Sequence, residues 1–295
     1  MSILGKTITV EIFAYQDYEG LSRLVPKILS WPIDQLIVSY GGDIQSKLFM
    51  DKIKHEKLIK LFEPQRLGKI SAINRAMKFA EGEIVFQISA DVDIEQDSLI
   101  KLIGSMDDET GVSVPRIVPI KISGFIKHAG KLIWDLEDCQ KLFFQERGKN
   151  NHGGEVLCIK KSLIEEIPPE TYSDDGFICT VVQKKGYKVR YERNAVSYNT
   201  PPGKLKDLLS QRRRTNLSKM KLKDLNLSEN VLNNILISDP KSFILIIGVF
   251  IKNYPFDFPF FPFLLFVEFI SFILAKKDKR RNVAFKWEIL ESSKL

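Results

Sequence analysis

The 295 residues are 44% hydrophobic and 27% charged, which excludes a disordered chain and supplies enough apolar side chains for a buried core. The 44 Lys and Arg residues exceed the 37 Asp and Glu residues by 7, a net charge that permits contact with phosphates or an anionic membrane without identifying either. Three widely spaced cysteines and three histidines argue against a disulfide framework and against a zinc cage.

The amino-terminal third of the chain alternates short apolar runs with amphipathic stretches. In chain order it predicts a strand at 7–15, a helix at 20–30, strands at 35–39 and 58–62, a helix at 69–81 and a strand at 84–88. This alternation is typical of parallel strands joined by helical crossovers. Such sheets bind their ligands at the carboxyl ends of the strands, so the loops there are where chemistry is expected.

The rest of the chain divides at about residue 224. Before it, the pattern predicts a strand at 112–118, a helix at 134–144, a strand at 153–159, a helix at 173–186 and a strand at 188–191, followed by a basic segment at 201–224. After it come two strongly apolar segments, 242–251 and 258–275, and then a basic run at 276–281. We therefore expect an α/β domain over 1–224 and a helical, membrane-associated region over 225–295.

Two acids, Asp91 and Asp93, follow the apolar strand at 84–88. Carboxylates two residues apart beyond a strand end can share a divalent cation, which in turn can bind the diphosphate of a nucleotide. The alternative is a solvated turn that leads into the next helix.

A second candidate site begins at Arg66, between a strand and a helix. Gly68 would let a phosphate approach the free N–H groups of the helix, and Arg66 and Lys69 would neutralise the phosphate charge. The alternative is an ordinary β–α turn with solvated cations.

Two adjacent acids, Asp174 and Asp175, begin the helix predicted at 173–186. One of them can cap the helix, and the other can act as a general base on an acceptor hydroxyl. Three consecutive arginines at 212–214 point in three directions on a helix, so one or two can reach a ligand while the alternative is a charged surface.

In their order along the chain, these motifs resemble the large inverting glycosyltransferase family numbered two, which has the GT-A fold, over about residues 7–220. The family's A-Y-N-E is similar to residues 14–17 (AYQD), and its G-K-x-x-A-x-N is similar to residues 68–74 (GKISAIN). Its D-A-D, T-E-D and Q-x-x-R-W are similar to residues 89–91 (SAD), 173–175 (SDD) and 211–215 (QRRRT).

The resemblance implies a GT-A, Rossmann-like sheet, mixed but mainly parallel and flanked by helices. It implies transfer of a sugar from a nucleotide-diphosphate donor to a hydroxyl with inversion, in which Asp175, beside Asp174, is the catalytic base. Asp91 would bind Mg²⁺ or Mn²⁺, with Asp93 as an additional ligand. Substrate- and nucleotide-binding residues would be Ala14, Tyr15, Asp17, Asp43, Arg66, Gly68, Lys69, Asn74, Gln211 and Arg214.

Three departures from the family pattern limit what the resemblance carries over. The family's D-D-G-S is SYGGD here, at residues 39–43, so the usual base-contacting acids are absent and the nucleotide stays open. Ser89 replaces the first acid of D-A-D, and Thr215 replaces a tryptophan. The loss of the tryptophan removes a stacking surface and weakens the inference of a long polysaccharide product.

The apolar segments narrow the expected acceptor and location. Segment 242–251 is too short to cross a bilayer and segment 258–275 is just long enough, but a single crossing would place the basic run 276–281 on the far side. We therefore expect a re-entrant or interfacial hairpin on the cytoplasmic face of the cell membrane, and a lipid-linked or membrane-embedded acceptor. The competing functions are a glycoside hydrolase and a basic scaffold or nucleic-acid-binding module without catalysis.

Overall fold

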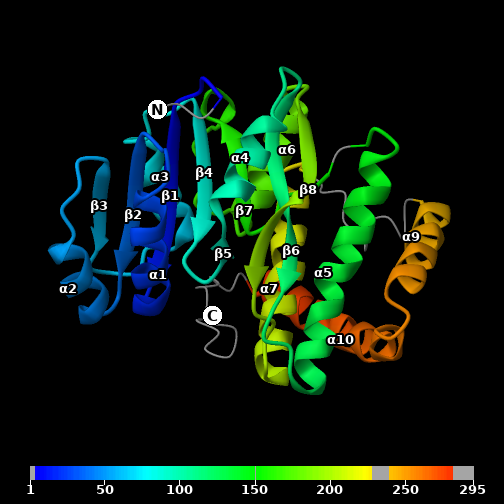
Figure 1. Ribbon diagram of the computed structural model, residues 1–295. Helices are drawn as coiled ribbons and strands as arrows, with labels where there is room; N and C mark the ends of the chain where they lie inside the picture. The colour runs from blue at the N-terminus through cyan, green and yellow to red at the C-terminus, as the bar shows by residue number, and fades with distance from the viewer. Residues whose placement is uncertain (1–3, 150, 228–238, 282–295) are drawn as a thin grey trace.

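The computed structural model describes residues 4–149, 151–227 and 239–281. Within these residues, eight strands form one sheet in the order β3-β2-β1-β4-β7-β6-β8-β5 (Figure 1). The strands are β1 (Ile8–Tyr15), β2 (Gln35–Gly41), β3 (Leu58–Glu63), β4 (Ile84–Ser89), β5 (Asp93–Ile94), β6 (Thr110–Pro119), β7 (Val156–Lys160) and β8 (Lys188–Asn199).

The first four long strands, β1 to β4, are all parallel, so their carboxyl ends meet at one edge of the sheet. β7 then pairs antiparallel with both β4 and β6, and β6 pairs parallel with β8. The expected mixed, mainly parallel sheet flanked by helices is confirmed.

Side-chain alternation along the strands divides the core into two layers. In β1, Ile8, Val10 and Ile12 join one buried cluster, while Phe13 joins the other. The first cluster lies under α1 (Tyr18–Leu29), α2 (Ile44–Lys52) and α4 (Gln96–Gly104), and the second lies under α3 (Lys69–Met77) and α6 (Asp174–Lys184).

Some elements differ from the expectation. The helix expected at 134–144 is the longer α5 (Gly124–Gln145), and the strand expected at 188–191 continues as β8 to Asn199. Strand β8 is longer because its polar residues alternate with buried ones against β6, a pairing that local composition does not reveal. Helix α2 was not expected, because it has only a weak amphipathic pattern and two buried residues, Ser46 and Met50.

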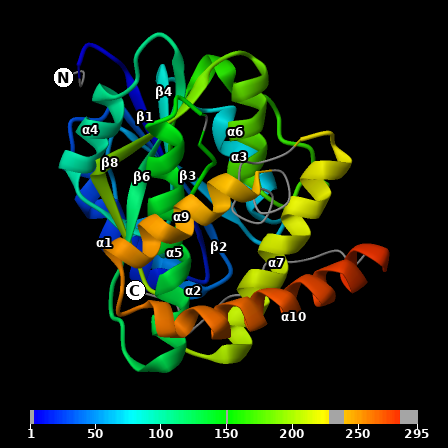
Figure 2. The ribbon, with the colours of Figure 1, turned by 90° about the vertical axis from the view of Figure 1, so that its right-hand side faces the viewer.

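The basic segment forms α7 (Leu205–Asp224), and the two apolar segments form α9 (Pro240–Asn253) and α10 (Phe261–Arg280), joined through the short helix η2 (Phe258–Phe260). A second short helix, η1 (Lys161–Leu163), follows β7. Helix α9 packs on α5, and α10 runs beside α7 (Figure 2). Residues 228–238 and 282–295 of the expected carboxyl-terminal region lie outside the described residues.

Candidate functional site

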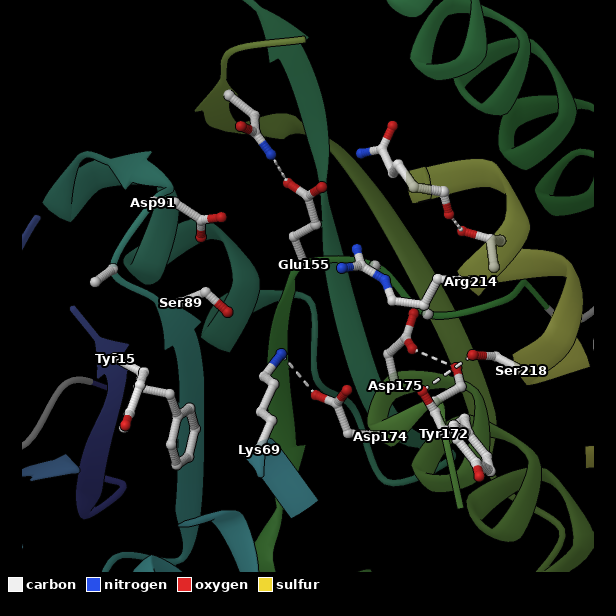
Figure 3. A pocket seen from close by; sticks show the side chains of 18 of the residues that line it. Tyr15, Lys69, Ser89, Asp91, Glu155, Tyr172, Asp174, Asp175, Arg214 and Ser218 are labelled. Atoms are coloured by element: carbon white, nitrogen blue, oxygen red, sulfur yellow. Dashed lines mark hydrogen bonds and ion pairs between the residues drawn. The ribbon is translucent and has the colours of Figure 1, made fainter. Parts of the chain in front are cut away.

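A cavity of about 370 Å³ opens at the carboxyl ends of the parallel strands, a size typical of small-molecule sites. Its walls come from β1, β4, α5, α6, α7 and the loops before α3 and β7 (Figure 3). Eleven residues expected at the site line it: Ala14, Tyr15, Asp17, Arg66, Gly68, Lys69, Asp91, Asp174, Asp175, Gln211 and Arg214.

Three other expected residues are not among those that line the cavity. Asp43 caps α2 and accepts hydrogen bonds from the backbone N–H and the hydroxyl of Ser46. Asp93 lies 3.0 Å from the Lys27 ammonium, and Asn74 bonds the backbone of Ile167 in both directions. The Asp43 carboxylate is therefore engaged in capping its own helix, while Asp93 and Asn74 hold neighbouring elements together.

One wall of the cavity holds Asp174 and Asp175 at the amino terminus of α6, where Ser173 is the N-cap. Asp174 is buried, and its carboxylate lies 2.8 Å from the Lys69 ammonium, while the Asp175 carboxylate accepts a hydrogen bond of 2.7 Å from the Ser173 hydroxyl. The two adjacent acids thus have different partners.

The charges on this wall perturb one another. Burial and the neighbouring Asp174 charge raise the pKa of Asp175 above its usual value. Burial is the largest single effect on Lys69 and opposes its charged form, but Asp174, Asp175 and Asp91 together outweigh burial and raise the pKa of Lys69. Lys69 therefore stays cationic in its ion pair with Asp174, while the neighbouring Asp175 binds a proton more readily than an ordinary aspartate.

Two glycines allow the backbone to pack closely around this site. A Cβ atom on Gly153 would lie 2.8 Å from the Cβ of Asp175, so a side chain at 153 would displace the acid. Gly68 has φ +100°, a conformation that L side chains rarely adopt, at the residue before α3. Helix α3 begins directly after Gly68, at Lys69, so its first backbone N–H groups lie at the cavity wall.

The opposite end of the cavity contains Tyr15, Arg66 and Asp91. The Arg66 guanidinium lies 5.0 Å from the centre of the Tyr15 ring, which makes a cation–π contact. Asp91 is exposed and has no hydrogen bond or ion pair to any residue that the structure describes. Its carboxylate is available to a ligand.

The sequence did not point to Glu155, which lines the same cavity just before β7 and bonds the Asn199 amide. Burial, followed by the charge of Asp91, raises the pKa of Glu155 to about 7. Burial also lowers the pKa of Arg214 to about 10, against the attraction of Asp91 and Glu155. The signal that could have found Glu155 is the glycine pair 153–154 before it, which marks a close backbone approach.

Other lining residues were also missed, because they belong to none of the quoted motifs. Trp134 and Glu137 come from α5, His152 from the loop before β7, and Lys219 from α7. Burial lowers the pKa of His152 well below its usual value, so its ring is neutral at physiological pH.

The chemistry of the donor set suits a hard divalent cation, because Asp91 offers carboxylate oxygens at the mouth of a cavity that also contains cations for phosphates. In the part of the chain that the structure describes, no three His, Cys, Asp or Glu side chains form a metal-binding group. A cation here would need oxygen ligands from the substrate as well, which is how Mg²⁺ is commonly bound.

Comparisons with solved structures find the same fold. A mannosyltransferase from Pyrobaculum calidifontis, solved with GDP-Man and Mn²⁺, aligns over 94% of this chain and 88% of its own, with a TM-score of 0.64 and 15% identity. TarS from S. aureus aligns over 97% of this chain and 95% of its own, with a TM-score of 0.51 and 13% identity. The glucosyl-3-phosphoglycerate synthase of Mycobacterium tuberculosis, solved with Mn²⁺, UDP and phosphoglyceric acid, aligns over 77% and 81%, with a TM-score of 0.51 and 14% identity.

A search of curated proteins finds no match. The family model described as "Glycosyl transferase family 2" matches residues 12–162, about half of the chain, which include the carboxyl end of β1, Lys69, Asp91 and Glu155. The fold of the matched segment and the cavity at the ends of its strands agree with the expected GT-A fold. The chain therefore belongs to glycosyl transferase family 2, and it is a glycosyltransferase.

Proposed function

We propose that this glycosyltransferase moves a sugar from a nucleotide-diphosphate donor to a hydroxyl acceptor, with inversion and with the help of a divalent cation. The observation that carries the proposal is the layout of the cavity. Asp175 lies on one wall, and the cations Lys69 and Arg214 lie near the middle (Figure 3). Asp91, which has no hydrogen bond or ion pair within the described residues, lies at the other end.

Asp175 is the proposed general base. Its carboxylate takes the proton of the acceptor hydroxyl while the hydroxyl oxygen attacks the anomeric carbon and the bond from that carbon to the diphosphate oxygen breaks. Attack on the face opposite the leaving group inverts the anomeric configuration. The raised pKa of Asp175 suits this work, whereas Asp174 is held by Lys69.

The proposed work of the cations is electrostatic. Negative charge builds on the departing nucleoside diphosphate, and Lys69 and Arg214 are already fixed in the cavity to stabilise it. When bound, Mg²⁺ or Mn²⁺ at Asp91 would supply further positive charge to the same diphosphate oxygens. Two of the similar structures were solved with Mn²⁺, which supports this cofactor.

The acceptor is proposed to be carried by a membrane, on its cytoplasmic face. Exposed apolar side chains gather on one side of α10, opposite its buried face, and on α9 and the turn between them. They are Ile244, Leu245, Ile251, Phe256, Phe258, Leu265, Phe266, Phe269, Phe272 and Ile273. Exposed basic residues at the helix ends, Lys252, Lys276, Lys277, Arg280 and Arg281, would meet anionic headgroups.

Helix Phe258–Arg280 is long and apolar enough to cross a membrane. Its other face, however, is tied to α7 by ion pairs of Glu268 with Arg212 and of Asp278 with Arg213. A span would separate the half-buried Glu268 and the buried Asp278 from their partners. We therefore propose that the helix lies flat in the interface, which also keeps the membrane close to α7 and the cavity that it lines.

Sugar nucleotides with GDP, UDP and other bases, each with Mn²⁺, test the proposal by the rise in melting temperature and by release of the nucleoside diphosphate. A matching donor should stabilise the protein, and release should require the cation. Metal-independent cleavage of a glycoside without any nucleotide would instead indicate a hydrolase. Steeply salt-dependent binding of RNA or DNA without any response to sugar nucleotides would indicate a basic binding module.

A further inference from the structure

The pairing of β4 with β7 determines where Glu155 lies relative to the Asp91 motif. β4 and β7 pair antiparallel, with Ile88 opposite Val156. Ser89 follows Ile88 at the end of β4 and Glu155 precedes Val156 at the start of β7, so the end of this ladder brings the two positions close together. A carboxylate therefore lies near the serine that replaces the first acid of D-A-D, and both residues line the cavity.

Glu155 and Asp91 both line the cavity, and their side chains point into the same space from its two sides (Figure 3). Within the described residues, the Glu155 carboxylate accepts a hydrogen bond from the Asn199 amide, and it also experiences the negative charge of Asp91. The Arg214 guanidinium supplies one positive charge that both carboxylates attract. Two neighbouring carboxylates carry one more negative charge than this single cation, so this end of the cavity favours a further positively charged ligand.

A second observation points to a ligand at the same end. Thr200, the residue after Asn199, is 2% exposed and lines the cavity, and its hydroxyl has no hydrogen-bond partner within the described residues. A buried hydroxyl is normally satisfied, so a polar ligand or a water molecule bound with it would complete this site.

We propose that Glu155 and Asp91 together bind the divalent cation, with Glu155 supplying from β7 the carboxylate that position 89 lacks. The inference rests on the proposed use of a metal in sugar transfer. Mg²⁺ commonly uses one or two carboxylates together with substrate phosphates, so two acids from different strands are sufficient. Ser89 offers only a neutral hydroxyl to the same space.

The test is Mn²⁺ binding, measured from the electron paramagnetic resonance signal of free Mn²⁺, with no nucleotide and with saturating GDP or UDP. Glu155→Gln keeps the size of the side chain and its bond to Asn199, and it should weaken Mn²⁺ binding at least 10-fold. Asp93→Asn is the matched control: it removes a carboxylate two residues from Asp91 that is paired with Lys27, and it should leave the affinity unchanged.

Melting temperatures separate a ligand from a structural residue. In metal-free buffer, Glu155→Gln should melt at or above the wild-type temperature, because it removes a charge that faces Asp91, while its stabilisation by Mn²⁺ should be reduced. A lower metal-free melting temperature with an unchanged Mn²⁺ response would overturn the inference, as would wild-type affinity in Glu155→Gln or equal loss in Asp93→Asn. These experiments measure metal binding and not sugar transfer. If the wild type binds Mn²⁺ but Glu155→Gln binds it equally well, only the role of Glu155 is overturned and the proposed function stands.

Discussion

At the scale of single residues, the two adjacent acids of α6 make different contacts, so their substitutions should differ. Asp175→Asn should lower turnover about 10²- to 10⁴-fold, the usual worth of a general base, and leave donor binding nearly intact. Because the pKa of Asp175 is raised, wild-type turnover should fall on acidification at a higher pH than for an ordinary aspartate. Single-turnover rates and donor titrations measure both quantities.

Asp174→Asn is the internal control for that experiment. It removes the partner of Lys69, so it should lower stability and donor affinity more than the rate of the chemical step. A dead Asp174→Asn variant beside a mild Asp175→Asn variant would reverse the assignment of the base.

A second residue-scale prediction concerns Glu11, which is fully buried in β1 and accepts a hydrogen bond of 2.9 Å from Gln87. Burial raises the pKa of Glu11 from 4.5 to about 8. The folded state therefore keeps a proton that the unfolded state loses between these values, so this group's contribution to stability falls as pH rises from 4.5 to 8.

Glu11→Gln should remove that dependence, because the amide does not titrate. Between pH 6 and 8.5 the wild type should lose on the order of 2 kcal/mol more unfolding free energy than the variant, measured by urea unfolding. Glu56→Gln, at an exposed position, should follow the wild type. Parallel pH curves for wild type and Glu11→Gln would contradict the prediction.

At the scale of elements, Asn74 connects α3 to the loop before α6. Its amide donates to the Ile167 carbonyl at 2.8 Å, and its oxygen accepts from the Ile167 N–H at 2.9 Å. Since Ile167 is fully buried, Asn74→Ala should lower the unfolding free energy by about 2 kcal/mol, measured by urea unfolding. Lys78→Ala, at an exposed position just after the same helix, is the control. Normal stability with lost nucleotide affinity would instead support the nucleotide contact expected from the sequence.

How much of the structure could be predicted from the sequence differs from one element to the next. The parallel strands were predictable because β1, β2 and β4 are almost entirely buried on both faces, so apolar residues dominate each of them despite single polar residues such as Glu11 and Gln87. The acids of α6 were predictable because capping and resemblance both point to 173–175. Glu155 was not, because its meaning comes from pairing with β4 some 66 positions away along the chain. Asp43, Asn74 and Asp93 were expected at the site because residue type cannot distinguish a ligand from a cap or an ion pair.

At the scale of the whole molecule, the apolar side of α9 and α10 should bind anionic vesicles. Phe266 and Phe269 are 59% and 63% exposed, and burying each side chain is worth about 1.5–3 kcal/mol. The double variant Phe266→Asp with Phe269→Asp should lower partitioning onto phosphatidylglycerol vesicles about 100-fold in a flotation assay. Ile44→Asp with Leu48→Asp is the matched control, because it makes the same change at exposed positions of α2. Equal loss in both variants would point to general charge repulsion.

The mode of attachment is the last prediction. On the buried side of α10, Lys279 pairs with Asp224 in addition to the pairs of Glu268 and Asp278, so the helix is held along α7 at several points. A helix held in this way can immerse its phenylalanines but cannot turn to cross the bilayer without breaking those contacts. Washing native membranes at alkaline pH should therefore release the intact chain, and a tag after Leu295 should be digested from the same side as the catalytic domain. Retention after the wash together with a protected tag would establish a true span, with the ion pairs of α10 rearranged in the membrane.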